Sequence, residues 1–567
     1  MVKKFLHTSI LFLIIAVTFV ATTAITSVTA NAQANTFPSI HIVVPQCPFV
    51  YRDLWLNGTI SVTGAPEGQN FEPVDARTRG RGNSTWIDGS NKRPLRFTLD
   101  EARSMLGSEY EAREWILLAD NFDRSLMRNY AAFQLGAALG GMTFVPSGRH
   151  VHLYVNEQYM GIYLLTDERN NEPGRLTNVQ HDPDPAISGF IIELDSRAWH
   201  DDAILNVDFL RVNHRLYDIR FPRSSDMTPA HIEYLQNYMD SVSRAIRFGT
   251  FDEIESLIDI ESFVNFYIVQ EIMKNPDVDV LSNWMHISGE GDSRRLFKGP
   301  IWDFDMAGGN RPGLVFGDGP EGLFVGTLNY WFRYLLERPE FAYAVATRWA
   351  QARSNEIAEV INDLRVYSND FRHEFDRNFE RHPFETLTLG GTPQTRALHS
   401  FELQADLFLS WLEARVDWLD DVFMPWLYLH MHFGLNVGHV DLLWDLVQYH
   451  QHDLVTVLNV DGKTVNPTFH PINLRNRNLM EVGDIARILG ADFSFCSGEV
   501  FITYGNMRVD HFVGSDIYYI NGIEVVFDSP SYLIRDYVFI PVRVIVEGFG
   551  YTVNWSDRHR IISIFTE

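Results

Sequence analysis

Two acidic segments of the sequence have the composition of a site for metal-assisted phosphate chemistry. The segment G-P-I-W-D-F-D places Asp303 and Asp305 after an apolar run and ahead of a glycine pair. The segment K-N-P-D ends at Asp277, and Asp279 and Asn283 follow it. Carboxylate and amide oxygens bind Mg²⁺, and an aspartate in a loop can orient or deprotonate a hydroxyl group. Two carboxylates that face one loop also repel each other unless a cation is bound.

A glycine- and arginine-rich segment further upstream could contact a phosphate. The segment R-G-R-G-N-S-T-W begins at Arg79, includes Arg81, and is followed by Lys92 and Arg93. Backbone N–H groups of a glycine turn, together with nearby cations, form phosphate sites in many proteins. The segment L-L-T-D-E ends at Glu168 and adds polar residues at the end of an apolar strand. An ordinary turn with a solvated basic face is the alternative interpretation of the arginine-rich segment.

These parts are the ones that phosphoryl transfer requires, but their spacing is unusual. Protein kinases use a catalytic aspartate, an asparagine shortly after it, and a D-F-G aspartate. Here Asn283 follows Asp277 by six residues and Asp279 by four, and Asp303 follows Asp277 by twenty-six. The order agrees with that of protein kinases and the spacing does not, so the chain is not an ordinary protein kinase. Helix termination at Asp277 and a capped turn at Asp303 and Asp305 are the structural alternatives.

Hydrophobic patterns predict the elements that position these segments. Residues 150–155 and 161–165 flank N-E-Q and predict a β-hairpin, and residues 189–195 predict another strand. Apolar residues at helical spacing, with Thr228 and Asp259 as predicted caps, indicate amphipathic helices. The large domain is therefore of the α+β class and is expected to span residues 38–427. Its helices are predicted at 125–139, from Pro229 to about 246, from 260 to 272, and at about 403–422.

The last part of the chain, residues 453–567, repeats itself at an offset of sixty without a gap. The triplet V-D-G at Val460 matches I-N-G at Ile520, and Glu481 stands where the second half has Pro541. Such repetition predicts a duplicated, β-rich α+β module. The segment P-V-R-x-I-x-E-G-F-G-Y-x-V-x-W resembles the copper amine oxidase N-terminal domain, a non-catalytic module of many secreted bacterial proteins. The resemblance implies contact with a cell wall or spore surface.

Composition excludes several classes of protein. The 567 residues carry 47 Lys and Arg against 73 Asp and Glu, a net charge of −26, and 46% are hydrophobic. A chain of this composition buries several cores, and so acidic a surface repels nucleic-acid backbones. Two cysteines exclude a disulfide scaffold and a Cys-built zinc site. A phosphate-binding site on this chain therefore needs bound cations and a local basic cluster, which we expect at Arg79, Arg81, Lys92 and Arg93.

The N-terminus has the layout of a secretory signal peptide. Lys3 and Lys4 precede an apolar run, and small residues follow up to Ala34. This pattern predicts a signal peptide over residues 1–34 with cleavage after Ala34, while an uncleaved membrane anchor is the alternative. Either interpretation predicts an exported protein that acts outside the cell, at the cell surface or at the spore surface.

A histidine-dense stretch, residues 428–452, is expected to connect the two folded parts. Imidazole groups bind transition metals, but no carboxylate or cysteine completes a pattern of ligands here. A solvated connector is therefore the favoured interpretation over a metal site. Its histidines are His430, His432, His439, His450 and His452.

Taken together, the segments of the large domain resemble the spore-coat protein H (CotH) kinases, atypical kinases with a remote protein-kinase-like fold. The resemblance extends over about residues 40–425 in family order, which is more specific than any single motif. It implies transfer of phosphate from ATP, with Mg²⁺ or Mn²⁺, to serine or threonine residues of partner proteins. The matching segments are R-G-R-G-N-S-T-W, K-R-P-L-R-F, S-L-M-R-N-Y-A-A-F-Q-L, L-Y-V-N-E-Q-Y-M-G-I-Y-L-L-T-D-E, G-F-I-I-E-L-D, E-I-M-K-N-P-D and G-P-I-W-D-F-D.

The resemblance also implies roles for individual residues. Asp277 would be the catalytic-loop aspartate that orients or deprotonates the acceptor hydroxyl, with Asp279 as the alternative. Asp303 and Asp305 would hold the metal ions. The remaining assignments are Asn283 as a further metal ligand, Lys92 and Arg79 as cations at the phosphates, and Glu168 as a nucleotide contact at a hinge-like segment.

Two other functions remain open from the sequence. A structural or adhesive surface protein could carry the same domain as an inactive pseudokinase, although retention of the acidic residues favours an enzyme. A carbohydrate-active protein could use Trp411 and Trp418, but tryptophans at this spacing are more often part of a helix core.

Overall fold

The computed structural model describes residues 37–433 and 457–566 apart from short interior stretches. The predicted signal peptide lies outside the described residues, as do His439, His450 and His452 of the predicted connector. Within the described part of the chain, no helix is both long and apolar enough to cross a membrane. The interior positions left out are 46, 48–49, 83, 88–91, 197–208, 312–318, 388–389, 470, 475–476, 497, 528, 535–536 and 557–560.

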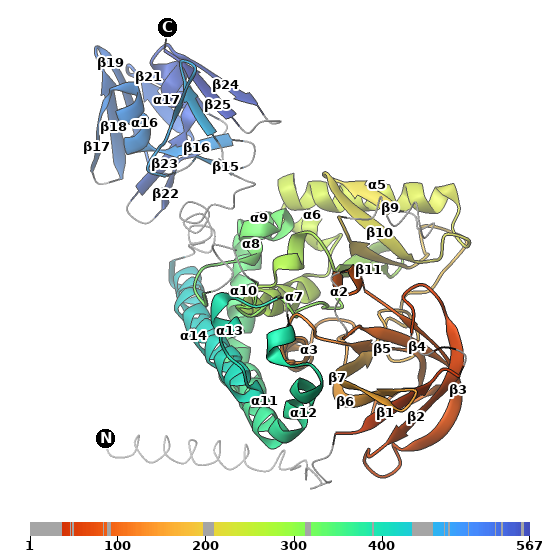
Figure 1. Ribbon diagram of the computed structural model, residues 1–567. Helices are drawn as coiled ribbons and strands as arrows, with labels where there is room; N and C mark the ends of the chain where they lie inside the picture. The colour runs from red at the N-terminus through yellow and green to blue at the C-terminus, as the bar shows by residue number, and fades with distance from the viewer. Residues whose placement is uncertain are drawn as a thin grey trace, which may run out of the picture.

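The first strands of the chain close into a barrel in the order β1-β2-β3-β4-β5-β7-β6 (Figure 1). Strands β6 and β7 form the hairpin that the sequence predicts, and its turn residues Asn156 and Glu157 have φ values of 48° and 66°. Two left-handed residues are what a two-residue hairpin turn requires. The strands are β1 Ser39–Val43, β2 Leu56–Thr63, β3 Phe71–Gly80, β4 Leu95–Arg103, β5 Ala112–Leu118, β6 Gly148–Val155 and β7 Gln158–Asp167.

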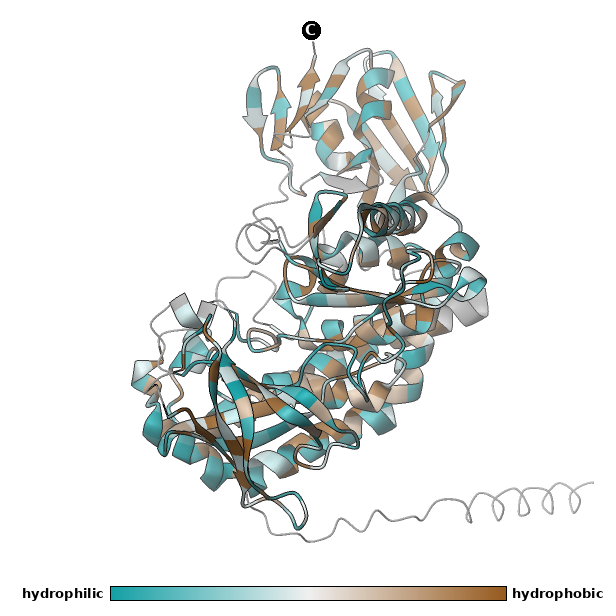
Figure 2. Ribbon diagram, turned by 90° about the vertical axis from the view of Figure 1, so that its right-hand side faces the viewer, coloured by the Kyte–Doolittle hydropathy of each residue, from teal (hydrophilic) through white to brown (hydrophobic). Residues whose placement is uncertain are grey.

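Strands β5 and β7 are buried on both faces, which joins the barrel to the helices that follow. One set of alternating side chains fills the barrel core, and the other set packs in the helical core. Hydrophobic residues accordingly recur along strands and along the faces of helices (Figure 2). The barrel set is Trp115, Leu117, Tyr163 and Leu165, and the helical set is Ile116, Leu118, Ile162 and Leu164.

The second part of this domain combines a sheet in the order β12-β11-β8-β10-β9 with a group of helices. The sheet strands are β8 Phe190–Leu194, β9 Phe209–Val212, β10 Arg215–Phe221, β11 Asn283–Ser288 and β12 Arg295–Lys298. The helices are α2 Ser84–Ile87, α3 Arg128–Leu139, α5 Pro229–Phe248, α6 Phe251–Glu255, α7 Ile260–Met273, α8 Val325–Leu328, α9 Tyr330–Leu336, α10 Pro339–Ala352, α11 Ala358–Asp370, α12 Arg372–Arg381, α13 Pro393–Arg396 and α14 Phe401–Phe433, with short turns η1 Pro276–Asp279, η2 Gly291–Ser293, η3 Arg353–Ile357 and η4 Phe384–Thr386. Helix α14 continues past the boundary expected at residue 427 and includes the positions of His430 and His432.

Helix α7 carries the chain into the interior of the domain. Asp259 caps its start as predicted, because its carboxylate accepts the Ser262 N–H at 2.8 Å. From Ser262 to Met273 every residue is buried, which is the pattern of a central helix. Lys274 ends the helix in the left-handed conformation with φ 46°, and Pro276 begins η1. The loop that contains Asp277 is therefore fixed directly to a buried helix.

The C-terminal part, residues 457–566, repeats its order of elements as the sequence predicts. Elements β13 to β17 of the first half recur as β20 to β24 of the second. The sheets combine both halves, since β13 pairs in parallel with β25 and β16 pairs with β23. Their bounds are β13 Val457–Val460, β14 Lys463–Val465, β15 Ile472–Leu474, β16 Arg477–Glu481, α16 Val482–Leu489, β17 Asp492–Cys496, β18 Glu499–Tyr504, β19 Met507–Phe512, β20 Ile517–Ile520, β21 Ile523–Val526, β22 Tyr532–Ile534, β23 Tyr537–Pro541, α17 Val542–Gly548, β24 Thr552–Ser556 and β25 Ile561–Phe565.

Buried histidines make the large domain sensitive to acid. Burial lowers the pKa of His150 and of His382 to about 4, and that of His286 to about 3. His150 is held neutral between the Leu126 carbonyl and the Tyr367 hydroxyl, at 2.8 and 3.0 Å. As pH falls below 6.5, the unfolded chain binds protons that the folded chain does not, so stability is lost between about pH 6.5 and 4.

We expect the thermal midpoint of the large domain to fall steeply between about pH 6.5 and 4.5. Each unit by which burial lowers a histidine pKa corresponds to about 1.4 kcal/mol in the free energy of unfolding. Acidification through this range should therefore lower the free energy of unfolding by several kcal/mol for the three histidines together. The measurement is the thermal midpoint as a function of pH for the wild type and for His286→Leu. This variant removes the contribution of one of the three histidines to the loss of stability. The variant comparison is needed because buried carboxylates such as Asp279 shift stability in the opposite direction. If the thermal midpoints of the wild type and of His286→Leu change with pH to the same extent, the prediction is wrong.

Candidate active site

A cleft beside the barrel brings together most of the residues that the sequence analysis singles out. Its volume is about 480 Å³, and its walls come from β3, β4, the end of β7, strands β8 and β10, and the loops around η1 and after β12. Five of the predicted site residues line it together, although they are far apart in the sequence. These are Arg79, Glu168, Asp277, Asp303 and Asp305.

One wall of the cleft is acidic. Asp277 comes from η1, Asp303 and Asp305 come from the loop after β12, and Asp120 comes from the loop after β5. Asp303 has φ 66°, a left-handed conformation that is rare for residues other than glycine, so the surrounding structure must hold it. Four carboxylates from three segments therefore line a common space.

Hydrogen bonds from buried amide side chains fix these loops relative to each other. Asn129 donates to the Asp120 carboxylate at 2.7 Å and accepts the Phe304 N–H at 2.7 Å. Asn275 accepts the Asp277 N–H at 3.1 Å and donates to the Asp303 carbonyl at 3.3 Å. Each asparagine thus connects two of the segments that supply carboxylates, and the acidic wall is preorganised.

The acidic wall has the donor set of a divalent cation site. Burial raises the pKa of the Asp305 carboxyl well above its usual range, and the charges of Asp303, Asp120 and Asp277 raise it further. A bound cation removes this repulsion, and carboxylate oxygens are the ligands that Mg²⁺ and Mn²⁺ prefer. The donor types present therefore fit such an ion, whereas among the described residues the acidic group whose ligand atoms already lie within 4.8 Å of one another is Glu193, Asp195 and Asp218.

Another part of the cleft lining is made of arginines interleaved with tryptophans. The Arg81 guanidinium lies 5.4 Å from the Trp302 ring centroid, and Arg169 lies 3.7 Å from Trp302 and 4.4 Å from Trp284. Arg220 lies 5.9 Å from Trp284 and continues the series. Aromatic faces attract cations, so this arginine–tryptophan wall holds several guanidinium groups in fixed positions.

The positive charge of two arginines of this cleft is available to a ligand. Among the described residues, Arg79 and Arg81 have no carboxylate within ion-pair distance. Burial lowers the pKa of Arg81, although Glu168 and Asp303 attract its charge. An anion bound between Arg79 and Arg81 would compensate the cost of burying these guanidinium groups.

Glu168 lies at the end of β7, where it lines the cleft between two arginines. Its carboxylate pairs with Arg96 and with Arg169, both at 3.1 Å. Burial disfavours the charge of Glu168, but Arg96 and Arg169 outweigh that cost and lower the pKa of its carboxyl to about 2. Glu168 therefore fixes two arginines of the cleft, which is a different arrangement from a direct nucleotide contact.

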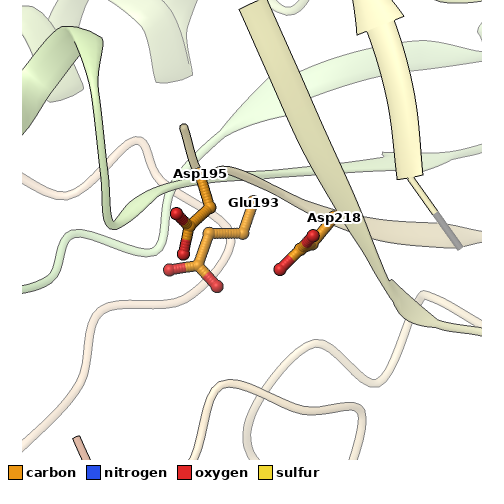
Figure 3. Close-up of side chains that lie close together, drawn as sticks. All are labelled: Glu193, Asp195 and Asp218. Atoms are coloured by element: carbon orange, nitrogen blue, oxygen red, sulfur yellow. The ribbon is translucent and has the colours of Figure 1, made fainter. Parts of the chain in front are cut away.

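A second acidic group lies on the sheet side of the cleft. The carboxylates of Glu193, Asp195 and Asp218 lie close together (Figure 3). Glu193 and Asp218 are directly opposite on β8 and β10, where like charges repel. Arg220 compensates them, with 2.8 Å to Glu193 and 2.5 Å to Asp218. Burial opposes the charge of Arg220, but Glu193 and Asp218 outweigh it and raise the pKa of its guanidinium.

Lys92 does not line the cleft. It is buried, 2% exposed, and its ammonium lies 5.4 Å from the Tyr163 ring centroid in the barrel. Burial lowers the pKa of Lys92, and the nearby charges of Asp120 and Asp123 oppose that shift. Of the expected basic cluster, Arg79 and Arg81 therefore reach the cleft, while Arg93 lies over the Trp86 ring at 4.8 Å.

Asn283 is also placed away from the cleft. It begins β11 and is 2% exposed, with its amide N–H donating to the Val278 carbonyl at 2.5 Å. Its amide oxygen accepts from the Lys298 ammonium at 2.6 Å. Both polar atoms of Asn283 thus hold η1 against the sheet, and the amide oxygen faces a cation that belongs to the protein.

The structure separates the two candidates for the catalytic aspartate. Asp277 lines the cleft. Asp279, on the same turn, is buried and paired with Arg215. Burial raises the pKa of Asp279 to about 6, while Arg215 opposes that shift. Only Asp277 of this pair can contact a molecule in the cleft.

Sequence reasoning missed several residues of the cleft. Asp120 and Arg169 each follow the end of an apolar strand, which is the same signal that identifies Asp303, so a systematic search of strand ends would find them. Arg96 and Arg220 lie within β4 and β10 and resemble ordinary exposed strand residues. Their contribution depends on how the barrel and the sheet meet, which no local pattern shows.

Comparison with known families gives the context of this site. A family model described as copper amine oxidase N-terminal domain matches residues 459–564 and confirms the resemblance of the duplicated module. No curated protein matches the chain. A model described as CotH kinase protein matches residues 77–419, a range that includes the three segments of the acidic wall and the arginines of the arginine–tryptophan wall. This match extends over more than half of the 567 residues, and the chain belongs to the CotH kinase family.

Proposed function

We propose that this protein is an atypical protein kinase that transfers phosphate from ATP to serine or threonine residues of partner proteins. One observation carries the proposal. Asp277, Asp303 and Asp305, from two separate loops, line one cleft together with Arg79 and Arg81, whose positive charge is available to an anion. Membership of the CotH kinase family supports the phosphotransferase class.

Each residue of the two walls then has a chemical task. Asp277 accepts the proton of the acceptor hydroxyl as the hydroxyl oxygen attacks the γ-phosphorus, the bond from the γ-phosphorus to the β–γ bridging oxygen breaks, and ADP leaves. Asp303 and Asp305 would hold Mg²⁺ or Mn²⁺, which supplies charge neutralisation at the phosphates. Arg79 and Arg81 take the place at the phosphates that Lys92 was expected to fill, because a guanidinium offers paired N–H donors to phosphate oxygens. Asn129 and Asn275 keep the two loops in register during the reaction.

The setting of this activity is part of the proposal. The apolar N-terminal segment supports export, and the duplicated module at residues 459–564 supports attachment at a cell or spore surface. The acceptors would then be proteins of the same surface.

Phosphate transfer by the purified full chain tests the proposed function. With labelled ATP, Mg²⁺ or Mn²⁺ and a serine-rich acceptor, we expect the wild type to label the acceptor. Asp303→Ala should reduce labelling by about 10²-fold or more, because a metal ligand of the transferred group is lost. Asp370→Ala, at an exposed position of α11, is the matched control and should label at the wild-type rate.

The outcomes separate the alternatives. A wild type that neither binds nucleotide nor transfers phosphate would favour the non-catalytic surface protein with a pseudokinase domain. Full transfer by Asp303→Ala would instead contradict the assignment of the metal site while leaving the activity itself in place.

A further inference from the structure

Ser282 occupies a position in the cleft that no part of the mechanism above uses. It lines the cleft together with Asp277 and Asp303. Its hydroxyl donates to Asp303 Oδ2 at 3.0 Å. The hydroxyl oxygen keeps lone pairs for a further contact on the side of the acidic wall.

The backbone of Ser282 is held in an unusual conformation. Its φ is 53°, in the left-handed region where residues other than glycine are strained and asparagine is best tolerated. The next residue, Asn283, begins β11 and is anchored through both atoms of its amide. The turn between η1 and β11 therefore directs the side chain of Ser282 to the cleft and that of Asn283 into the interior.

The spacing between Asp277 and Ser282 matches the spacing between the catalytic aspartate and a metal-binding residue in protein kinases. In protein kinases the H-R-D-x-x-x-x-N motif places a metal-binding asparagine after the catalytic aspartate. Counted from Asp277, that position is Ser282 and not Asn283. A side-chain oxygen is thus present where kinases have one, although the residue type differs.

We propose that the Ser282 hydroxyl is an oxygen ligand of the cation held by Asp303 and Asp305. This inference rests on the proposed function and names a further metal ligand of the same site. A hydroxyl is a neutral oxygen donor, and Mg²⁺ and Mn²⁺ accept such donors beside carboxylates. Ser282 then acts on the cation directly and also orients the Asp303 carboxylate.

Three substitutions at Ser282 separate ligation from folding. Ser282→Gly removes the hydroxyl and relieves the backbone strain, so its thermal midpoint should equal or exceed that of the wild type. Ser282→Ala removes the hydroxyl and keeps the strain. Ser282→Asn supplies an amide oxygen in a residue that tolerates this conformation. The matched control is Ser225→Gly, since the exposed Ser225 hydroxyl also donates to an aspartate, Asp226, at 3.1 Å.

The experiment is a Mn²⁺ titration of the full chain, followed by electron paramagnetic resonance in the presence of a non-hydrolysable ATP analogue. We expect Ser282→Gly and Ser282→Ala to weaken Mn²⁺ binding by about tenfold or more. Ser282→Asn should bind Mn²⁺ within about threefold of the wild type, and Ser225→Gly should bind it unchanged. Thermal midpoints of the same samples show that each variant is folded.

Two results would overturn the inference. One is a folded Ser282→Gly variant with the Mn²⁺ affinity of the wild type. The other is a folded Ser282→Asn variant that binds Mn²⁺ no better than Ser282→Gly, which would show that the hydroxyl only orients Asp303. A wild type that binds no Mn²⁺ with nucleotide defeats the proposed function itself, so the two failures are distinguishable.

Discussion

Replacing Asp277 with asparagine is expected to lower phosphate transfer by about 10²–10⁴-fold, the usual contribution of a general base. Asparagine has nearly the same shape and keeps the hydrogen bond that the backbone N–H of residue 277 donates to the Asn275 side-chain oxygen. It cannot accept the proton of the acceptor hydroxyl. The measurement is the single-turnover rate of label transfer from ATP, with nucleotide affinity measured in parallel and expected to change little.

Asp279→Asn is the control for this prediction. Asp279 lies on the same turn, is buried, and pairs with Arg215 rather than facing the cleft. Because burial outweighs Arg215 in setting its pKa, its replacement by a neutral amide should change the thermal midpoint little, and the folded protein should retain most of its transfer rate. The reverse pattern, with full transfer in Asp277→Asn and loss in folded Asp279→Asn, would show that the catalytic aspartate is the other one.

Replacing Arg415 with methionine is expected to destabilise the large domain by about 3–5 kcal/mol. Arg415 on α14 and Glu271 on α7 are both fully buried, with 2.7 Å between Nη2 and Oε1. Arg415 also donates to the carbonyls of Pro320 and Gly322, at 2.7 and 2.8 Å. The substitution leaves the Glu271 carboxylate buried without its cation. The midpoint of denaturant unfolding of the large domain measures the effect.

Two further variants show whether the unpaired charge is the cause. Combining Glu271→Gln with Arg415→Met removes the charge and keeps an acceptor oxygen for one of the Phe324 and Val325 N–H groups, so part of the stability should return. The exposed pair Arg372–Glu402 is the comparison, because Arg372→Met there should cost about 1 kcal/mol or less. Equal losses at the buried and the exposed pair would contradict the argument.

Local patterns in the sequence predict much of the fold correctly. The hairpin of β6 and β7, the cap of α7 at Asp259 and the repetition in the last part of the chain each depend on neighbouring residues or on internal similarity. Such signals do not require knowledge of tertiary structure. The closed barrel is different, because the parallel pairing of β1 with β6 joins residues that no local pattern connects.

Some residues of the candidate site can also be predicted from local patterns, whereas others depend on tertiary structure. Asp303 and Asp305 are identifiable because they follow an apolar run, and the structure places them in the cleft. Lys92 and Asn283 have the right chemistry and the right neighbourhood in the sequence, but both side chains are buried away from the cleft. Ser282 and Asn283 are adjacent in the sequence, but their side chains point in different directions. The side chain of Ser282 lines the cleft, and that of Asn283 is buried in the interior. Orientation at this scale depends on the backbone conformation of a single turn.

The pairing of β13 with β25 has a consequence for how the C-terminal module forms. Leu458 lies beside Ile562, and the Asp461 carboxylate accepts the N–H of Thr566 at 2.8 Å, so the first strand is completed by the last. Contacts between residues so distant in the sequence form slowly. Ribosomes and export channels release a chain from its N-terminus onward. The first half of the module therefore lacks its parallel neighbour strand until β25 has emerged.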